Sequence, residues 1–153
     1  ADIALTKRSP VENFRIDWVV ERSGKPIGVA GLVDLDFFNR RAEIQMGLPN
    51  ERGYGESLEA ALLVLEFAFS VMKLKKLTSY VYSDNPGGQG HTMRLGFKQE
   101  GFLRSHVYDK EASRWLDLYV NGHLAEEFFC DKKYMYLCNR FLGRDPRVPG
   151  RAD

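Results

Sequence analysis

The sequence predicts a mixed α/β domain, and three observations indicate this fold class. Residues 14–48 contain three strand-like segments, and in the first and third of them apolar residues recur with the two-residue period of strands. Residues 57–73 follow with the period of an amphipathic helix, and residues 77–82 form a β-rich run directly after it. A strand, a helix and a strand in this order predict a parallel pair, so the sheet is expected to be mixed.

The three early segments are expected to form an antiparallel meander, because only short turns separate them. The first and third alternate apolar and polar residues, whereas the second is apolar on both faces until Asp34 and Asp36, as in a central strand. Their predicted ranges are residues 14–21, 27–37 and 42–48. Residues 1–13 show no clear strand period.

The long helix carries one core-facing stripe, formed by Leu58, Leu62, Leu65 and Phe69. The further predicted elements are a loop (84–88), a short helix (89–95) ended by Gly96, a hairpin (99–108 with 114–123) and a helix (134–141). Residues 1–143 are expected to form a single domain. Residues 144–153 contain two prolines and a glycine among charges and are expected to be a flexible tail.

The composition of the sequence argues against several classes of protein. The 153 residues carry a formal net charge of +1, so bulk charge gives no support for nucleic-acid binding. No apolar run reaches the length of a membrane span and no signal peptide is visible, which predicts a cytoplasmic protein. Cys130 and Cys138 lack zinc-site spacing and are expected to be buried thiols of a reducing compartment, and no metal is expected.

The turn at residues 48–57 is the strongest candidate for a binding site. It leads into the long helix and contains Gly53 and Gly55, whose missing Cβ atoms allow close approach of a ligand. The N–H groups at a helix start have no intrahelical partner, and the helix dipole favours an anion there. A phosphate is therefore expected, with Arg52 adding a charged fork. The alternative is a plain strand-to-helix turn, since the glycines match neither a Walker loop nor a dinucleotide fingerprint.

A series of short motifs surrounds this turn. It consists of Asn39 to Leu48, Arg52-Gly-Tyr-Gly-Glu56, Ala68-Phe69, Asp84-Asn85, Leu95-Gly96-Phe97 and Glu100 to Arg104. In order and spacing the series resembles the GNAT acetyltransferase superfamily, on the branch with ribosomal-protein N-terminal alanine acetyltransferases and small-amine acetyltransferases. The resemblance covers residues 18–128 and implies a central mixed sheet with a splayed parallel strand pair and flanking helices. It also implies an N-terminal strand and two helices, which are shortened or missing here.

The resemblance implies acetyl-CoA as the cofactor, held between the two splayed strands. In this sequence those strands are residues 42–48 and 77–82, with pantetheine beside the first strand and pyrophosphate over the turn. The implied cofactor-binding residues are Met46, Leu48, Arg52, Gly53, Tyr54, Gly55, Glu56, Ser57 and Asn85. Asn50 stands where the family has Gln or Arg. Its amide cannot pair with phosphate charge, and Arg52 is expected to compensate.

Glu43 is the candidate general base, because the resemblance aligns it with a strand glutamate that some family members use directly or through a water. Its alternative role is an ion pair with Arg40 or Arg41 on the strand face. Asp34 and Asp36 are the next candidates. They are expected to act as bases, to bind a cationic acceptor, or simply to end their strand.

The general acid is where the sequence departs from the family. A tyrosine that can protonate the CoA sulfur often stands at the position of Thr92, and a serine used by the ribosomal-protein branch corresponds to Gly88. A threonine hydroxyl can hydrogen-bond a thiolate but is a poor acid, so solvent or His91 is expected to supply the proton. His106 and His123 are expected to be structural, as lone histidines on strands usually are.

The sequence therefore predicts an N-acetyltransferase that moves an acetyl group from acetyl-CoA to a primary amine, with Glu43 and Thr92 as catalytic residues. The acceptor classes left open are an amino sugar, an antibiotic amine, a polyamine and a protein N-terminus. The first alternative is a non-catalytic acyl-CoA-binding or regulatory module, favoured by Thr92 and the short N-terminus. The second is a structural domain, favoured if the change at Asn50 abolishes cofactor binding. The expected partners are a small-molecule or peptide amine and a second copy in a homodimer, with neither nucleic acid nor membrane.

Overall fold

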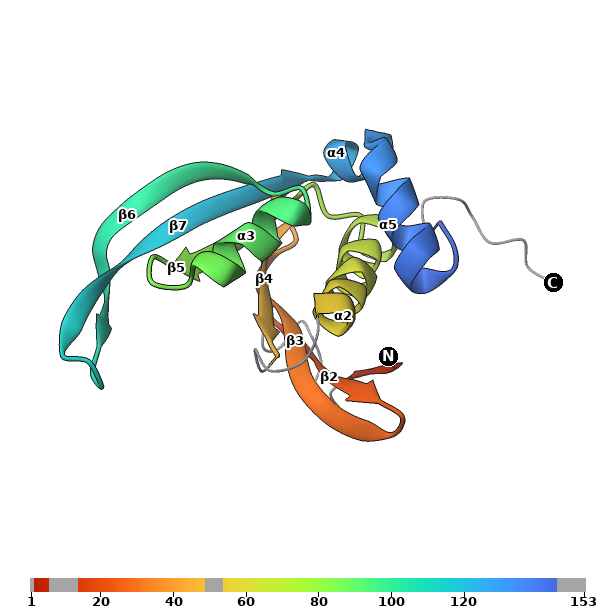
Figure 1. Cartoon of the computed structure of the whole chain (residues 1–153). Helices are drawn as coiled ribbons and strands as arrows, with labels where there is room; N and C mark the ends of the chain where they lie inside the picture. Colours follow the sequence, from red (N-terminus) through yellow and green to blue (C-terminus); the bar gives the residue numbers. More distant parts are fainter. Residues whose placement is uncertain (1, 6–13, 49–53, 146–153) are drawn as a thin grey trace.

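Seven strands form one mixed sheet in the computed structural model, which describes residues 2–5, 14–48 and 54–145 (Figure 1). The strands lie in the order β1-β2-β3-β4-β5-β7-β6. Their bounds are β1 Asp2–Leu5, β2 Ile16–Arg22, β3 Lys25–Asp36, β4 Arg41–Gly47, β5 Lys76–Tyr82, β6 Lys98–Asp109 and β7 Arg114–Leu124. The sheet confirms the predicted fold class.

The predicted antiparallel meander is formed by β2, β3 and β4, in which Trp18 lies opposite Ala30 and Leu32 lies opposite Ile44. β4 and β5 are parallel, as the order of strand, helix and strand predicted. β1 was not apparent in the side-chain pattern, yet it pairs antiparallel with β2. Backbone pairing along the edge of β2, rather than an alternation of side chains, defines so short a strand.

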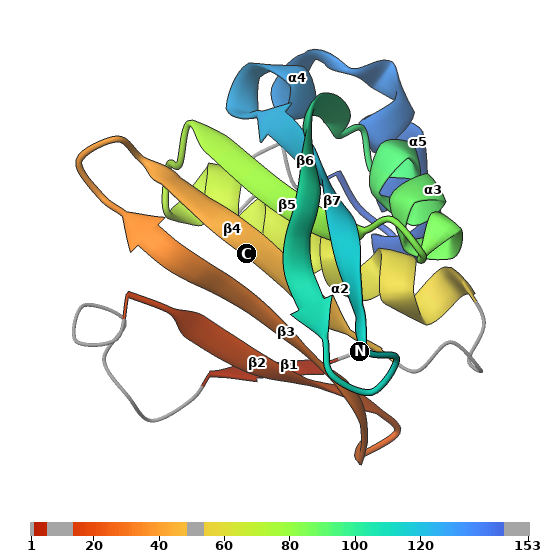
Figure 2. The same cartoon turned by 90° about the vertical axis from the view of Figure 1, so that its left-hand side faces the viewer.

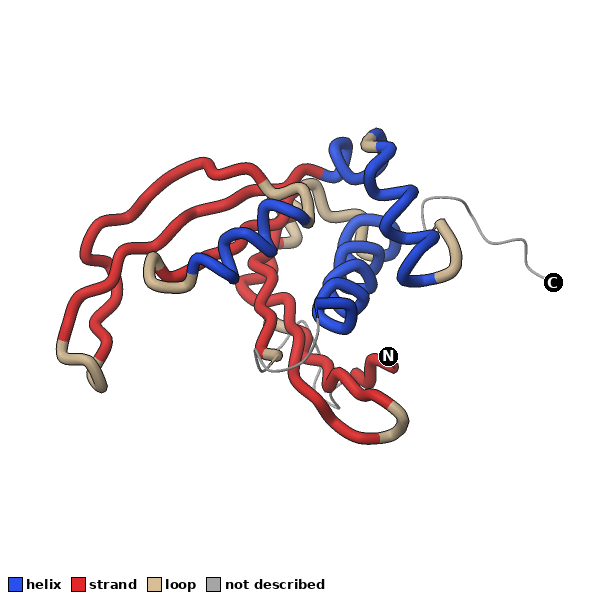
Figure 3. The backbone as a smooth tube through the Cα atoms, viewed as in Figure 1, coloured by secondary structure: helices blue, strands red, loops and turns tan. Residues whose placement is uncertain are grey.

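The described helices are α2 Tyr54–Glu66, the π-helix η1 Phe67–Val71, α3 Pro86–Arg94, α4 Ala125–Cys130 and α5 Lys132–Leu142. Asn121 and His123 lie two residues apart on β7 and so point to the same face of the sheet, where the first contacts α3 and the second contacts α5. In Figure 2 strands β4 and β5 lie in front of α2, so this view looks onto the opposite face, and Figure 3 sets the helices apart from the strands by colour. None of the described helices is long and apolar enough to cross a membrane.

The core lies between the sheet and α2, and the predicted stripe faces it. Leu62, Leu65 and Phe69 are almost fully buried, and Leu58 packs against them at the margin. The helix begins at Tyr54, before its predicted start, and widens into a π-helix at Phe67, where the N–H of Met72 donates to the Phe67 carbonyl. The predicted end at residue 73 is therefore wrong.

Two other helix boundaries differ from the expectation. α3 begins at Pro86 rather than at residue 89, because Asn85 caps it and proline is favoured in a first turn. The predicted loop over residues 84–88 is thus mostly helical. α4 was not predicted, since its six residues are too few to show a helical period. The hairpin of β6 and β7 and the C-terminal helix α5 are confirmed.

Two expectations about the C-terminal part require correction. Arg144 does not begin a frayed end, because its guanidinium forms two hydrogen bonds with the Glu66 carboxylate, at 2.6 and 2.7 Å. Residues 146–153 of the predicted tail lie outside the described part of the chain. Cys138 is a buried free thiol, as expected, but Cys130 is exposed.

Candidate active site

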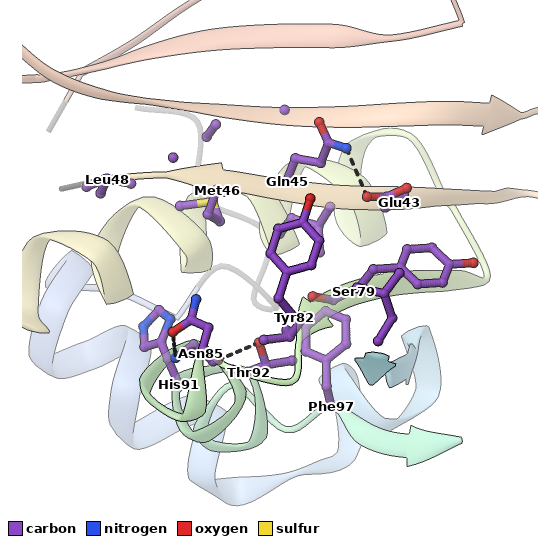
Figure 4. Close-up of a pocket in the computed structure, with 18 of the residues that line it drawn as sticks. Glu43, Gln45, Met46, Leu48, Ser79, Tyr82, Asn85, His91, Thr92 and Phe97 are labelled. Carbon is purple, nitrogen blue, oxygen red and sulfur yellow. Dashed lines mark hydrogen bonds between the residues drawn. The ribbon is translucent and has the colours of Figure 1, made fainter. Parts of the chain in front are cut away.

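A large cleft opens where β4 and β5 part. Only three residue pairs join these strands, ending at Glu43 opposite Thr78, although β4 continues to Gly47 and β5 to Tyr82. The cleft has a volume of about 1320 Å³ and reaches from α3 across the gap to the open face of the sheet (Figure 4). Residues of β3, β4, β5, α3, β6 and β7 line it, together with Ser57 of α2.

The backbone of β4 presents free hydrogen-bonding groups to this cleft. The Arg40 carbonyl accepts hydrogen bonds from the N–H groups of Lys75 and Lys76, on the β5 side. Since backbone groups of a strand alternate sides, the Ile44 carbonyl and the N–H and carbonyl of Met46 also point toward β5, beyond the last pair with that strand. An elongated amide-containing ligand can take the place of the missing strand there. This wall fits the pantetheine arm that the sequence predicted beside Met46 and Leu48, which both line the cleft.

Glu43 stands at the point where the two strands separate, with its half-buried side chain in the cleft. Its Oε1 accepts a hydrogen bond of 2.9 Å from the Gln45 side-chain amide (Figure 4). The alternative ion pair with Arg41 does not form, because Arg41 bonds to Asp36 at 3.2 Å. Within the described residues Glu43 has no cationic partner, so its carboxylate is available to an incoming ammonium group.

Helix α3 forms the other wall. The Asn85 side chain lies in the cleft and accepts a 2.8 Å hydrogen bond from the Gly88 N–H, so its carbonyl oxygen is used as a helix cap. Thr92 is buried at the cleft floor, and its hydroxyl donates to the Gly88 carbonyl at 2.9 Å (Figure 4). The hydroxyl proton of Thr92 is therefore engaged within the helix, which agrees with its expected weakness as an acid.

His91 also lines the cleft, and its Nε2 is buried without a hydrogen-bond partner among the described residues. Burial lowers the pKa of His91 below its usual 6.5, and the nearby positive charge of Arg94 lowers it further. The ring is therefore neutral at neutral pH, and a neutral imidazole is a poor proton donor to a thiolate. Of the two expected proton sources, this observation favours solvent.

Part of the predicted phosphate turn, including Asn50, Arg52 and Gly53, lies outside the described residues. Of the rest, Ser57 faces the cleft. Glu56 forms an ion pair with Arg22 of β2, so its carboxylate is committed away from a phosphate. Tyr54 and Gly55 open α2, with the Gly55 backbone near the Phe141 ring of α5.

The remaining candidate acids and bases have structural roles. Asp36 ends β3, where its carboxylate accepts hydrogen bonds from Asn39 and Arg41 that lower its pKa. Asp34 is exposed at a bulge and does not line the cleft. The described residues hold no group of His, Cys, Asp and Glu side chains that could bind a metal ion.

His123 is fully buried and belongs to the core, as expected. Its Nε2 lies 2.8 Å from the Tyr134 hydroxyl, and its Nδ1 lies 3.4 Å from a Glu127 oxygen. A single tautomer satisfies both contacts: Nδ1–H donates to the carboxylate and Nε2 accepts from the hydroxyl. Lys98 and the Leu124 N–H also bond to Glu127, and these contacts lower the pKa of Glu127 to about 2.

His106, in contrast, reaches the cleft because of an irregularity that the sequence did not reveal. Between Leu103 and Val107 the register of β6 shifts, and the Asp117 carboxylate accepts a 2.7 Å hydrogen bond from the Ser105 N–H. The bulge turns His106 toward the cleft lining. A bulge of this kind has no period to detect, so only the structure could show it.

We expect the free energy of unfolding to fall as the pH drops below about 6.5, by up to ~1.4 kcal/mol per pH unit for each buried histidine. Burial lowers the pKa of His123 from 6.5, although Glu127 opposes this shift, and burial also lowers that of His91. Below pH 6.5 these histidines therefore bind protons in the unfolded chain that they do not bind in the folded chain. Stability that is fully present above 6.5 is lost as the pH drops. Urea unfolding at a series of pH values measures this slope.

The matched variant is His123→Gln, whose amide can still accept from Tyr134 and donate to Glu127 but does not titrate. Its stability should depend less steeply on pH than that of the wild type. An unchanged slope would show that His123 does not contribute to it.

Comparison with known families agrees with this geometry. The family model of the acetyltransferase (GNAT) domain matches residues 2–98 of the chain. The chain belongs to the GNAT acetyltransferase family. The matched GNAT segment includes the meander, the parallel pair and α3, and thus both walls of the cleft.

Among the relatives of this chain, spermidine N(1)-acetyltransferase of Escherichia coli K12 is 36% identical over 92 residues, which are 60% of this chain and 50% of that protein. An uncharacterized N-acetyltransferase, p20 of Bacillus licheniformis, is 30% identical over 74% of this chain and 64% of its own length. The chain thus spans about half to two thirds of these relatives. The dodecameric structure of spermidine N-acetyltransferase from Vibrio cholerae superposes with a TM-score of 0.71 at 25% identity, over 77% of this chain and 69% of that one.

Proposed function

We propose that this GNAT protein is an N-acetyltransferase that moves an acetyl group from acetyl-CoA to a primary amine. The observation that carries the proposal is the gap between β4 and β5, with free backbone groups on one wall and Glu43 where the strands part. Acetyl-CoA, when bound, supplies an acyl group activated as a thioester. Met46 of β4, Leu48 directly after β4 and the α3 cap Asn85 line its path, and Ser57 lies in the first turn of α2 on the same path.

In this proposal Glu43 takes a proton from the ammonium group of the acceptor, directly or through one water. The free amine nitrogen then attacks the thioester carbonyl carbon, so that a C–N bond forms, the C–S bond breaks and the nitrogen releases its second proton to solvent. The sulfur leaves as a thiolate and takes a proton from solvent, which is tolerable because a free thiol has a pKa of about 8.5. Thr92 can still accept a hydrogen bond through its oxygen at the floor of the cleft.

The acceptor is a primary amine whose class the relatives suggest. The Escherichia coli and Vibrio cholerae proteins are named for spermidine, which favours a polyamine as the first acceptor to test. An amino sugar, an antibiotic amine and a protein N-terminus are the other members of the panel. A thiol-release assay with acetyl-CoA and each amine tests the proposal, and no release with any amine would overturn it.

A second candidate function is a non-catalytic acyl-CoA-binding module. It is favoured by the state of the two residues considered as proton sources, because the Thr92 proton is engaged and His91 is neutral. Calorimetric titration separates the candidates: the module binds acetyl-CoA with no thiol release over the amine panel. If acetyl-CoA does not bind at all, a structural role is the remaining candidate function.

Self-association, seen in the dodecameric relative, is proposed for this chain and is measurable by light scattering.

Gly55→Val should weaken acetyl-CoA binding by about tenfold or more, equivalent to ~1.4 kcal/mol. The added side chain crowds the anion site at the start of α2. An added Cβ lies 3.6 Å from the Phe141 ring, an ordinary contact, so the fold should tolerate the change. Calorimetry with acetyl-CoA gives the affinity. Gly90→Val is the control, since a Cβ at Gly90 meets nothing within 4 Å and Gly90 does not line the cleft. Equal affinity in Gly55→Val and the control would remove the phosphate site from the proposal.

A further inference from the structure

The floor of the cleft is apolar beneath α3. Thr92, Leu95 and Phe97 line it from the helix and the residues that follow, and Val81 and Ser79 line it from β5. Each has 9% or less of its surface exposed, so the cleft here reaches the hydrophobic core. The Phe97 N–H donates to the Thr92 carbonyl at 3.3 Å, which holds these two residues next to each other (Figure 4).

The depth of this floor is fixed by a polar clamp. The side-chain amides of Gln89 on α3 and Asn121 on β7 exchange two hydrogen bonds of 2.9 Å, and Asn121 also donates to the Ser79 carbonyl at 3.3 Å. Asn121 is fully buried, so the clamp would be costly to break. α3 is therefore held at a set distance from β5, and the floor is preformed.

Three directions lead away from the point where β4 and β5 part. Along β4 the free backbone groups suit an amide-containing arm, and toward the open face of the sheet Glu43 suits an ammonium group. The third direction leads to the apolar floor at Thr92 and Phe97. Hydrocarbon is the chemical group that such a buried apolar surface stabilises.

Building on the proposed function, we propose that the site takes an acyl group longer than acetyl, of about the length of butyryl, whose chain lies on this floor. Thr92 is the residue that determines this length, because a larger side chain at its place in the cleft lining would fill the space that the acyl chain takes. The transfer step is unchanged: the C–N bond forms at the same carbonyl carbon, and the thiolate leaves.

Calorimetric titration of the full chain with CoA, acetyl-CoA, propionyl-CoA and butyryl-CoA tests this assignment. Each methylene buried against the floor should strengthen binding by about fourfold, so butyryl-CoA, with two more methylenes, should bind about sixteenfold tighter than acetyl-CoA. In Thr92→Phe the ring covers the floor, and this preference should disappear. Gly90→Phe places the same ring on α3 away from the cleft and should keep it. If thermal unfolding shows that Thr92→Phe does not fold, Thr92→Leu replaces it.

The outcomes separate this inference from the proposed function. Equal or weaker binding of butyryl-CoA by the wild type overturns the longer acyl group and leaves acetyl transfer intact. A preference that survives in the Thr92 variant overturns the assignment of the floor. If neither CoA nor any of its esters binds, both the proposed function and this inference fail.

Discussion

Glu43→Gln should lower kcat/KM for the amine acceptor by about a hundredfold near pH 7, the scale expected for loss of a general base. The loss should shrink at high pH, because the acceptor then arrives as free amine and needs no base. The change is isosteric, and the amide oxygen can still accept from Gln45, so the fold should be retained. Steady-state rates as a function of pH, with acetyl-CoA saturating, give the measurement.

Asp34→Asn is the matched control for this experiment. It removes the same charge from the neighbouring strand at an exposed position outside the cleft, and asparagine tolerates the positive φ of 50° there. Its activity should equal that of the wild type. If Glu43→Gln lost the same factor at every pH, the carboxylate would be positioning the acceptor or the strand rather than accepting a proton.

Gly96→Ala should lower the free energy of unfolding by about 3 kcal/mol or more, the largest effect on stability that we expect. Gly96 ends α3 with a φ of +87°, where an L-residue is strained. An added Cβ would lie 2.2 Å from the Tyr134 hydroxyl, so Tyr134 must move. That movement breaks its hydrogen bond to His123 and leaves two buried polar groups without partners.

Urea unfolding measures this loss in Gly96→Ala, and Gly90→Ala is the control variant. Gly90 lies inside α3 with open space around its Cβ position, so alanine there should stabilise the protein by about 0.5–1 kcal/mol. A loss below about 1 kcal/mol in Gly96→Ala would mean that Tyr134 can move away without cost.

Glu43 shows which features of the site a local sequence pattern predicts and which it leaves open. Alternation along residues 42–48 and the helix that follows predicted the strand and its parallel partner, and the family resemblance pointed to Glu43. The same pattern allowed either a free carboxylate or an ion pair with arginine. The register of β3 against β4 decided between them, since it places Asp36 opposite Arg41 and so supplies that arginine with another partner.

What the sequence determined by itself was strands β2 to β7, the long helix and the Gly96 stop, because each depends on residues a few positions apart whose period or dihedral preference is visible locally. The tertiary structure alone decided what Thr92 does, with its hydroxyl bonded to Gly88 and its neighbours Leu95 and Phe97 forming a floor. It alone brought Arg144 to Glu66 and His123 to Tyr134, and turned His106 into the cleft. Contacts between residues far apart in the chain, and bulges in a strand, arise from the packing of whole elements, and no local period encodes them.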